Sequence, residues 1–158
     1  ECPKKLKFPS GLYACDDVET NEPFAYEAYT EAKNLIAATN NGEFITLNCE
    51  TDPEKAPQCQ IDGTGKRYLS YFDVKVGEKL VDYSTQITRM GYAFAYTQFT
   101  ATKMKEICMA EYAADNEDIK IWSLGLTFAE ILSKFGPQKA EFLTDEHWTI
   151  CDAAIGAP

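Results

Sequence analysis

Residues suited to acid–base or nucleophilic chemistry are sparse in this sequence. The chain has one histidine, His147. A Ser-His-Asp triad would need His147 as its base, and no Gly-x-Ser-x-Gly turn is present to expose a serine. The segment Gly63-x-Gly65-Lys66 resembles part of a phosphate-binding loop but lacks the full Gly-x-x-x-x-Gly-Lys-Ser/Thr spacing. We therefore expect His147 to lie on the surface or half-buried, and we do not expect a nucleophilic hydrolase.

The cysteines favour disulfide bonds over a metal site. There are six of them, none in Cys-x-x-Cys spacing: Cys2, Cys15, Cys49, Cys59, Cys108 and Cys151. A structural zinc site usually takes its four ligands as close pairs, whereas dispersed cysteines in even number are typical of a disulfide framework. We expect three disulfides and an oxidising compartment. Cys49 and Cys59 are the expected local pair, and Cys2 or Cys15 would then pair with Cys108 or Cys151.

Charge and hydropathy limit the classes of partner that we expect this chain to bind. The net charge of −10 opposes binding to nucleic-acid backbones and anionic lipid. No apolar run reaches the roughly 18–20 residues of a membrane span. Adjacent carboxylates occur, but without the spaced ligands and central glycine of a calcium loop. The chain opens Glu1-Cys2-Pro3, which we interpret as the start of a mature secreted protein. We expect no metal, no cofactor and no membrane association.

Aromatic residues are the richest remaining feature, at 13% of the chain. Tyr92, Phe94 and Tyr96 stand at every second position, which predicts that they share one face of a strand. Packing between sheet and helix explains most such residues. The alternative is a ligand pocket or partner-binding face, because tyrosine offers both apolar area and a hydroxyl. These three residues are therefore the candidates for ligand or partner binding.

The clearest expected element is a helix over residues 22–39. Asn21 can cap it, Pro23 is tolerated in its first turn, and residues 40–42 (Asn-Asn-Gly) end it. An apolar stripe recurs at steps of three and four residues, through Ala25, Ala28, Tyr29, Ala32, Leu35 and Ile36. This stripe should pack against a sheet.

The middle of the chain predicts strands over residues 44–47, 68–76, 80–87, 90–99 and 104–112, with a turn at 76–79. A helical stripe over 121–135 and a short helix with Thr144 as N-cap follow. The predicted fold is therefore α+β: an antiparallel meander of four or five strands, an N-terminal helix packed on it, and C-terminal helices. We expect one secreted domain over 1–158, with a helix-plus-sheet core at 1–112 and a helical extension at 113–158.

The order of these features resembles a known family. The opening Tyr13-Ala14-Cys15-Asp16 followed by a helix, the segment 65–72 (Gly-Lys-Arg-Tyr-Leu-Ser-Tyr-Phe) and the segment 89–112 resemble the small secreted fungal ribonucleases of the T1/ribotoxin type. These segments are more similar still to the catalytically inactive ribonuclease-like effectors of plant-pathogenic fungi. The resemblance covers residues 12–112 and implies that 65–72 is the central strand and 89–112 the last two strands.

The same resemblance implies that RNA is not cleaved. The family's Tyr-Pro-His element is missing from 44–47, its glutamate base would fall at Tyr71 or Asp73, and its late histidine at Glu111; only Arg89 matches. We therefore expect a non-catalytic effector or virulence factor that binds a host protein. A carrier of a small apolar ligand, with an aromatic-lined pocket, is one alternative. A secreted hydrolase using Asp73, Arg89 and Glu111 is the other.

Overall fold

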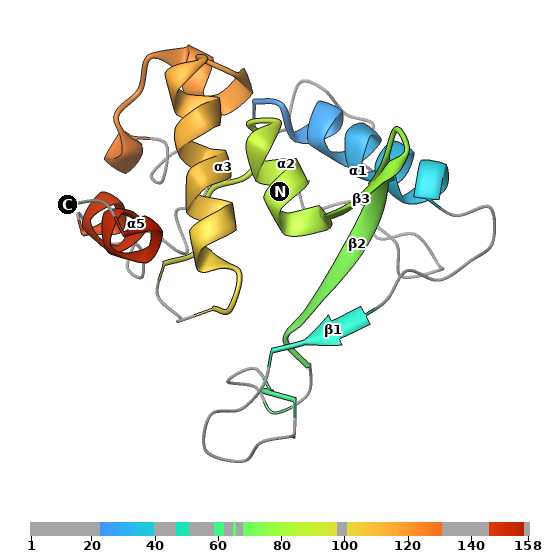
Figure 1. Cartoon of the computed structure of the whole chain (residues 1–158). Helices are drawn as coiled ribbons and strands as arrows, with labels where there is room; N and C mark the ends of the chain where they lie inside the picture. Colours follow the sequence, from blue (N-terminus) through green and yellow to red (C-terminus); the bar gives the residue numbers. More distant parts are fainter. Residues whose placement is uncertain are drawn as a thin grey trace.

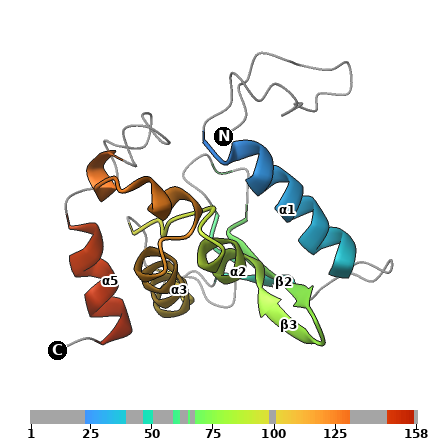
Figure 2. The same cartoon turned by 90° about the horizontal axis from the view of Figure 1, so that it is seen from above.

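The computed structural model describes residues 23–39, 47–50, 59–61, 65, 68–97, 101–130 and 146–156. Its elements run in the order α1 (Ala25–Thr39), β1 (Leu47–Cys49), β2 (Ser70–Val76), β3 (Lys79–Asp82), α2 (Tyr83–Arg89), α3 (Met104–Asn116), a 3-10 turn η1 (Lys120–Leu124) and α5 (His147–Ile155). They lie in a row from α5 through α3 and α2 to α1, with the sheet on the side of α2 and α1 (Figures 1 and 2). The α+β class is confirmed.

The sheet is antiparallel, with three strands in the order β1-β2-β3 among the described residues. Leu47 pairs with Phe72, and Val74 pairs with Val81 across the turn that Gly77 allows with its positive φ of 61°. The predicted hairpin is therefore present. β1 and the start of β2 extend away from the helices, and the extension continues through an isolated bridge between Ile61 and Tyr68 (Figure 1).

Two of the expected strands are wrong, and a third, the returning strand, is shorter than expected. The returning strand ends at Asp82, because its carboxylate accepts the amide of Thr85 at 2.9 Å and caps α2. Residues 90–96 form turns and irregular backbone, not a strand. Gly91 turns the chain there with a φ of 73°, and a Cβ at this position would stand 2.4 Å from the carbonyl oxygen of Ile119. Residues 104–112 belong to α3, whose buried residues recur with helical spacing: Met104, Cys108, Ala110, Glu111 and Ala114.

Helix α1 is confirmed, and it packs on the sheet by its C-terminal end. The hydroxyl of Thr39 accepts the amide of Lys75 in β2 at 2.6 Å and donates to the carbonyl of Leu35 at 2.6 Å. Of the predicted apolar stripe only Leu35 is buried, while Tyr29 and Ile36 are exposed. The helix buries a narrower face than its sequence periodicity predicts. The cap expected at Asn21 lies outside the described residues.

The hydrophobic core lies between α3, η1 and α5. Trp148 of α5 contacts both parts of this core, packing against Tyr112 at 4.7 Å and against Trp122 at 5.8 Å between ring centroids. The single helix expected over 121–135 is interrupted, because Gly125 adopts the left-handed conformation and ends η1 before helical backbone resumes at 128–130. The expected final helix is present as α5, and its predicted cap Thr144 lies outside the described residues.

Two disulfides join the described residues. Cys49–Cys59 is the predicted local pair and is confirmed. Cys108 pairs with Cys151, so the expectation that either would bind the N-terminal cysteines is wrong. Both residues point into the contact between α3 and α5, which brings them together. Cys2 and Cys15 lie outside the described residues. None of the described helices has both the length and the apolar character needed to cross a membrane.

Candidate functional site

The only histidine and a glutamate meet in the contact between α3 and α5. Nε2 of His147 lies 2.9 Å from Oε2 of Glu111, and Nδ1 of His147 lies 3.3 Å from the hydroxyl of Thr97. Glu111 and His147 each have 0% of their surface exposed. The expectation of a surface or half-buried histidine is therefore wrong: as the first residue of α5, His147 points into the core.

Aromatic rings enclose this pair. The ring of Phe128 stacks on the His147 imidazole with centroids 3.9 Å apart, and Trp148 meets the imidazole edge-on at 4.9 Å. Burial among these groups raises the pKa of Glu111; the His147 contact and the backbone amide of Ala95 oppose the rise without cancelling it. The second carboxylate oxygen, Oε1, has no hydrogen-bond partner of normal geometry among the described residues. No substrate can reach such a buried pair, so it is not a catalytic dyad in this conformation.

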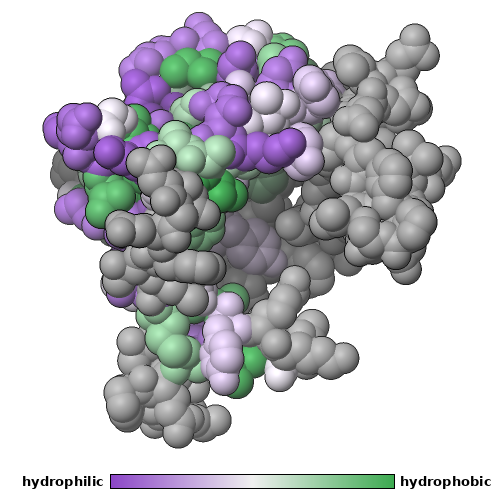
Figure 3. All heavy atoms as spheres, turned by 90° about the vertical axis from the view of Figure 1, so that its right-hand side faces the viewer, coloured by the Kyte–Doolittle hydropathy of each residue, from purple (hydrophilic) through white to green (hydrophobic). Residues whose placement is uncertain are grey.

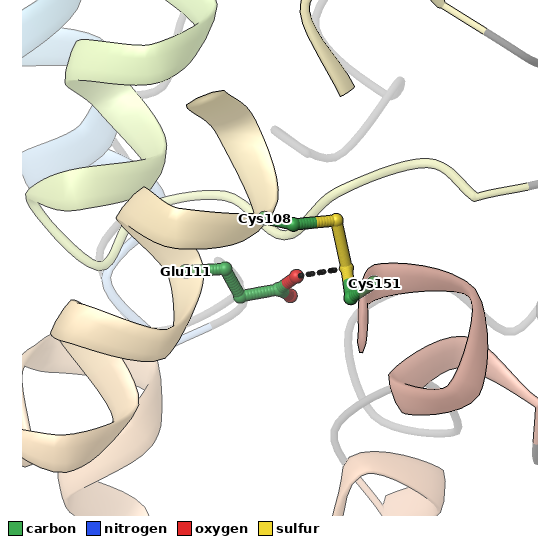
Figure 4. A group of neighbouring side chains, drawn as sticks. All are labelled: Cys108, Glu111 and Cys151. Atoms are coloured by element: carbon green, nitrogen blue, oxygen red, sulfur yellow. Dashed lines mark hydrogen bonds between the residues drawn. A yellow bond between two sulfur atoms is a disulfide. The ribbon is translucent and has the colours of Figure 1, made fainter. Parts of the chain in front are cut away.

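The disulfide Cys108–Cys151 borders the same carboxylate. One ligand-type atom from each of Cys108, Glu111 and Cys151 lies within 4.8 Å of the others, and Figure 4 marks the 3.8 Å contact from the Cys151 sulfur to Glu111 Oε2. That sulfur carries no proton while it is bonded to Cys108, so the contact is not a hydrogen bond. Because neither sulfur is a thiolate, the three residues form no metal site in the oxidised protein.

A second buried carboxylate, Glu50, joins β1 to β2 and to the start of α3. Its oxygens accept the amide of Thr102 at 3.1 and 3.0 Å, the Thr102 hydroxyl, and the hydroxyl of Tyr71 at 2.6 Å. Burial alone would raise the pKa of Glu50, but these hydrogen bonds outweigh burial and lower the pKa. The same environment raises the pKa of Tyr71, through burial first and then through Glu50. This arrangement fixes the sheet to α3.

The three proposed catalytic residues have separate partners. Glu111 is in the α3–α5 contact, Arg89 at the end of α2 forms an exposed ion pair with Glu117 at 2.6 Å, and Asp73 in β2 lies 3.9 Å from Nζ of Lys103. The carboxylate of Asp82 lies closer to the same Lys103, at 3.3 Å. Each of these charges has a local structural role, and no contact joins the three candidates among the described residues.

The aromatic candidates are likewise not a strand face. Phe94 packs edge-on against Phe128 with centroids 5.9 Å apart, and Nζ of Lys120 lies over the ring of Tyr92 at 5.5 Å. Tyr96 is 37% exposed. The alternation in sequence therefore reflects three different environments along irregular backbone.

Large apolar side chains reach the surface at the extended end of the sheet. We call this end the sheet arm: residues 47–50, 59–61 and 68–72. Tyr68 is 67% exposed and its bridge partner Ile61 is 46% exposed. The Cys49–Cys59 disulfide and the hydrogen bonds of Leu69 to Glu50 and Gln60, both 2.9 Å, hold the backbone of the arm. Figure 3, which views the molecule from the side of α1, shows hydrophobic residues in green at the lower end, where the arm lies.

No protein-family model, curated protein or solved structure matches this chain. The Glu111–His147 pair was missed in the sequence because 36 residues separate its members. The only local signals were the spacings Cys108-x-x-Glu111 and His147-x-x-x-Cys151, each of which places two ligand-type residues on one helix face.

Proposed function

We propose that this protein is a secreted, disulfide-stabilised interaction protein that binds a host protein through the sheet arm. The observation that carries the proposal is Tyr68, which holds 67% of its surface in solvent on backbone fixed by a disulfide and a β-bridge. Tyrosine is enriched among the residues that dominate binding energy, because it combines a large apolar face with a hydroxyl and has few rotatable bonds.

The position of Ile61 supports the same surface. Directly paired residues of an antiparallel bridge point to the same side, so the side chains of Ile61 and Tyr68 form one apolar contact area. Because a disulfide and a β-bridge already join the segments of the arm, binding would order little additional backbone, which lowers the entropic cost of association. The proposed role as a non-catalytic effector rests on this surface and on the structural roles of the charged residues. The ribonuclease resemblance contributes only the choice of host, since the last two strands it implies at 89–112 are irregular backbone at 90–96 and helix α3 from Met104 onward.

The two alternative functions have less support. A hydrolase needs its acid, base and cation at one site, whereas Asp73, Arg89 and Glu111 have separate partners. A carrier lined by Tyr92, Phe94 and Tyr96 would need these rings on one cavity wall, whereas Phe94 packs on Phe128 and Tyr92 lies beneath Lys120. No contact among the described residues favours either alternative over binding.

The test is affinity capture with the oxidised protein from plant extract, because the resemblance to effectors of plant-pathogenic fungi implies a plant host. It compares wild type with Tyr68→Ser and Tyr68→Phe. Each protein retained by wild type is then purified and its Kd measured. Tyr68→Ser should weaken binding at least about 30-fold, the effect of losing about 2 kcal/mol at a hot spot, and Tyr68→Phe should weaken it less.

Met109→Ser is the matched control. It removes another exposed apolar side chain, 54% exposed, from α3 and should leave the Kd unchanged. The proposal fails if no protein is retained by wild type, or if Tyr68→Ser binds every retained protein as tightly as wild type does.

A further inference from the structure

Four side chains of the types that bind zinc converge between α3 and α5. Cys108 and Glu111 are three residues apart on α3, and His147 and Cys151 are four residues apart on α5. Both spacings place the two side chains on one face of their helix, and the two helices pack with these faces together. All four residues have 0% of their surface exposed. Two ligand pairs on facing helices are a known way to build a metal centre.

The distances are close to those of a zinc site. Ligand atoms around tetrahedral zinc lie about 3.3–3.8 Å apart, given bonds of about 2.0 Å to nitrogen or oxygen and 2.3 Å to sulfur. Here the ligand atoms of Cys108, Glu111 and Cys151 lie within 4.8 Å of one another, and Nε2 of His147 lies 2.9 Å from Glu111 Oε2. Figure 4 shows the Glu111 carboxylate pointing toward the two sulfurs. Binding all four to one ion requires the two sulfurs to separate and the imidazole of His147 to turn toward them.

Two further features of the cluster favour a ligand at this place. Glu111 Oε1 is a buried carboxylate oxygen with no hydrogen-bond partner of normal geometry among the described residues, which is costly unless something binds it. The Thr97 hydroxyl lies 3.3 Å from Nδ1 of His147, where it can accept a hydrogen bond from a protonated Nδ1. Nε2 then carries the lone pair and faces Glu111. Metal-binding histidines are usually held in this way through their other nitrogen.

We propose that reduction of the Cys108–Cys151 disulfide creates a zinc site formed by Cys108, Glu111, His147 and Cys151. A dithiol reductant supplies two electrons: the S–S bond breaks, both cysteines become thiols, and the reductant is oxidised to its own disulfide. Zinc then displaces to solvent one proton from each thiol and the proton shared between Oε2 of Glu111 and Nε2 of His147, and it binds the two thiolates, the carboxylate and neutral Nε2. The covalent bond and the metal are mutually exclusive, so the cluster joins α3 to α5 by sulfur–sulfur bonding under oxidising conditions and by zinc under reducing ones.

The first experiment uses the unmutated chain, in which His147 is the only histidine. The protein is labelled with nitrogen-15, reduced with a phosphine, and titrated with zinc or with cadmium-113. One ion should bind per chain with the reduced protein only, His147 Nε2 should shift on binding, and the cadmium resonance should fall in the range of mixed sulfur, nitrogen and oxygen ligands. Binding that leaves the His147 resonances unchanged, or a shift typical of four thiolates, would overturn the proposal, as would no binding at all.

Variants then separate this site from the remaining cysteines. Cys49→Ser/Cys59→Ser removes the other described disulfide and should retain the zinc affinity of the reduced protein. Cys108→Ser/Cys151→Ser should lose it. Thr97→Val should weaken zinc binding by about 10- to 100-fold if Thr97 orients the imidazole, while the His147 shift on saturation persists. An unchanged affinity in the Cys108→Ser/Cys151→Ser chain would assign the metal to other cysteines and refute the site.

Discussion

Two buried glutamates join elements that are distant in sequence, and their carboxyl groups differ in how burial is compensated by hydrogen bonds. Glu50 ties the sheet arm to the start of α3, beside the disulfide Cys49–Cys59. Glu111 lies between α3 and α5, beside the disulfide Cys108–Cys151. Burial disfavours the charged form of both carboxyl groups. The depth of burial and the hydrogen bonds together decide the direction of each pKa shift.

The carboxylate of Glu50 accepts hydrogen bonds from Thr102, by its amide and hydroxyl, and from Tyr71, and its pKa is lowered. The carboxylate of Glu111 has His147 on one oxygen and no partner of normal geometry on the other among the described residues, and its pKa is raised. Glu111 is more deeply buried than Glu50, with 0% against 9% of its surface exposed, so burial outweighs the hydrogen bonds at Glu111, whereas the hydrogen bonds outweigh burial at Glu50. One glutamate favours folding when charged, and the other favours folding when neutral.

The largest expected difference between the two regions is in their disulfides. Loop-closure entropy assigns about 4 kcal/mol to a disulfide that spans 43 residues, Cys108–Cys151, and about 3 kcal/mol to one that spans 10, Cys49–Cys59. Guanidinium unfolding of Cys108→Ala/Cys151→Ala and of Cys49→Ala/Cys59→Ala, with the other cysteines oxidised, measures both losses. Removing the fully buried Cys108–Cys151 pair should lower the free energy of unfolding more; an equal or reversed order would show that loop length and burial do not set the relative contributions of the two disulfides.

Replacing Glu50 should have the next largest effect. In Glu50→Gln an amide nitrogen takes the place of one accepting oxygen, so the free energy of unfolding at neutral pH should fall by about 2 kcal/mol. Tyr71→Phe removes only one of the donors and should cost about 1 kcal/mol. Urea unfolding measures both. Because the folded pKa of Glu50 is lowered, its contribution is present above the ordinary value of 4.5 and is lost as the pH falls through the lowered pKa.

The gap between wild type and Glu50→Gln should therefore narrow when unfolding is measured well below pH 4.5. A gap that stays constant across the acid range would mean that the charge of Glu50 contributes nothing to folding. The comparison with Glu111 would then lose its basis.

Local patterns were enough to predict some of this architecture. Helix α1 is visible in its apolar periodicity, and the β2–β3 hairpin in its alternation around Gly77. Helix α3 was mistaken for a strand because short apolar runs fit both periods, and only packing against α5 selects the helical one. Helix α2 was hidden because Thr85, Ile87 and Thr88 favour strands, while one cap at Asp82 decides the local structure.

The candidate sites were harder to predict, for a different physical reason. Cys49–Cys59 is a local pair and follows from its spacing. The contacts of Glu111 with His147 and of Glu50 with Thr102 span 36 and 52 residues, and no local preference encodes which distant residues will meet. Burial of His147 follows from the packing of α5 on α3, which a single sequence does not specify.

The smallest expected effect at neutral pH is that of Glu111→Gln in the oxidised protein. Glutamine keeps the shape of the side chain and removes the need to bury a charge, so the free energy of unfolding should stay within about 1 kcal/mol of wild type. Its pH dependence should be opposite to that of Glu50→Gln. The folded pKa of Glu111 is raised, so its stabilising contribution is complete below the ordinary value of 4.5 and is lost as the pH rises through the raised pKa.

Glu111→Gln should therefore gain stability relative to wild type as the pH rises above 4.5. Glu50→Gln should lose stability relative to wild type as the pH rises from the lowered pKa to 4.5, and the difference should stay constant above 4.5. Glu106→Gln, an exposed change on the same helix, controls for the loss of one negative charge. His147 faces Glu111 directly and lowers the pKa of its carboxyl group, whereas Asp115, one turn further along α3, raises that pKa. Parallel stability profiles for wild type and Glu111→Gln would show that the two buried glutamates do not differ in the way their hydrogen bonds predict.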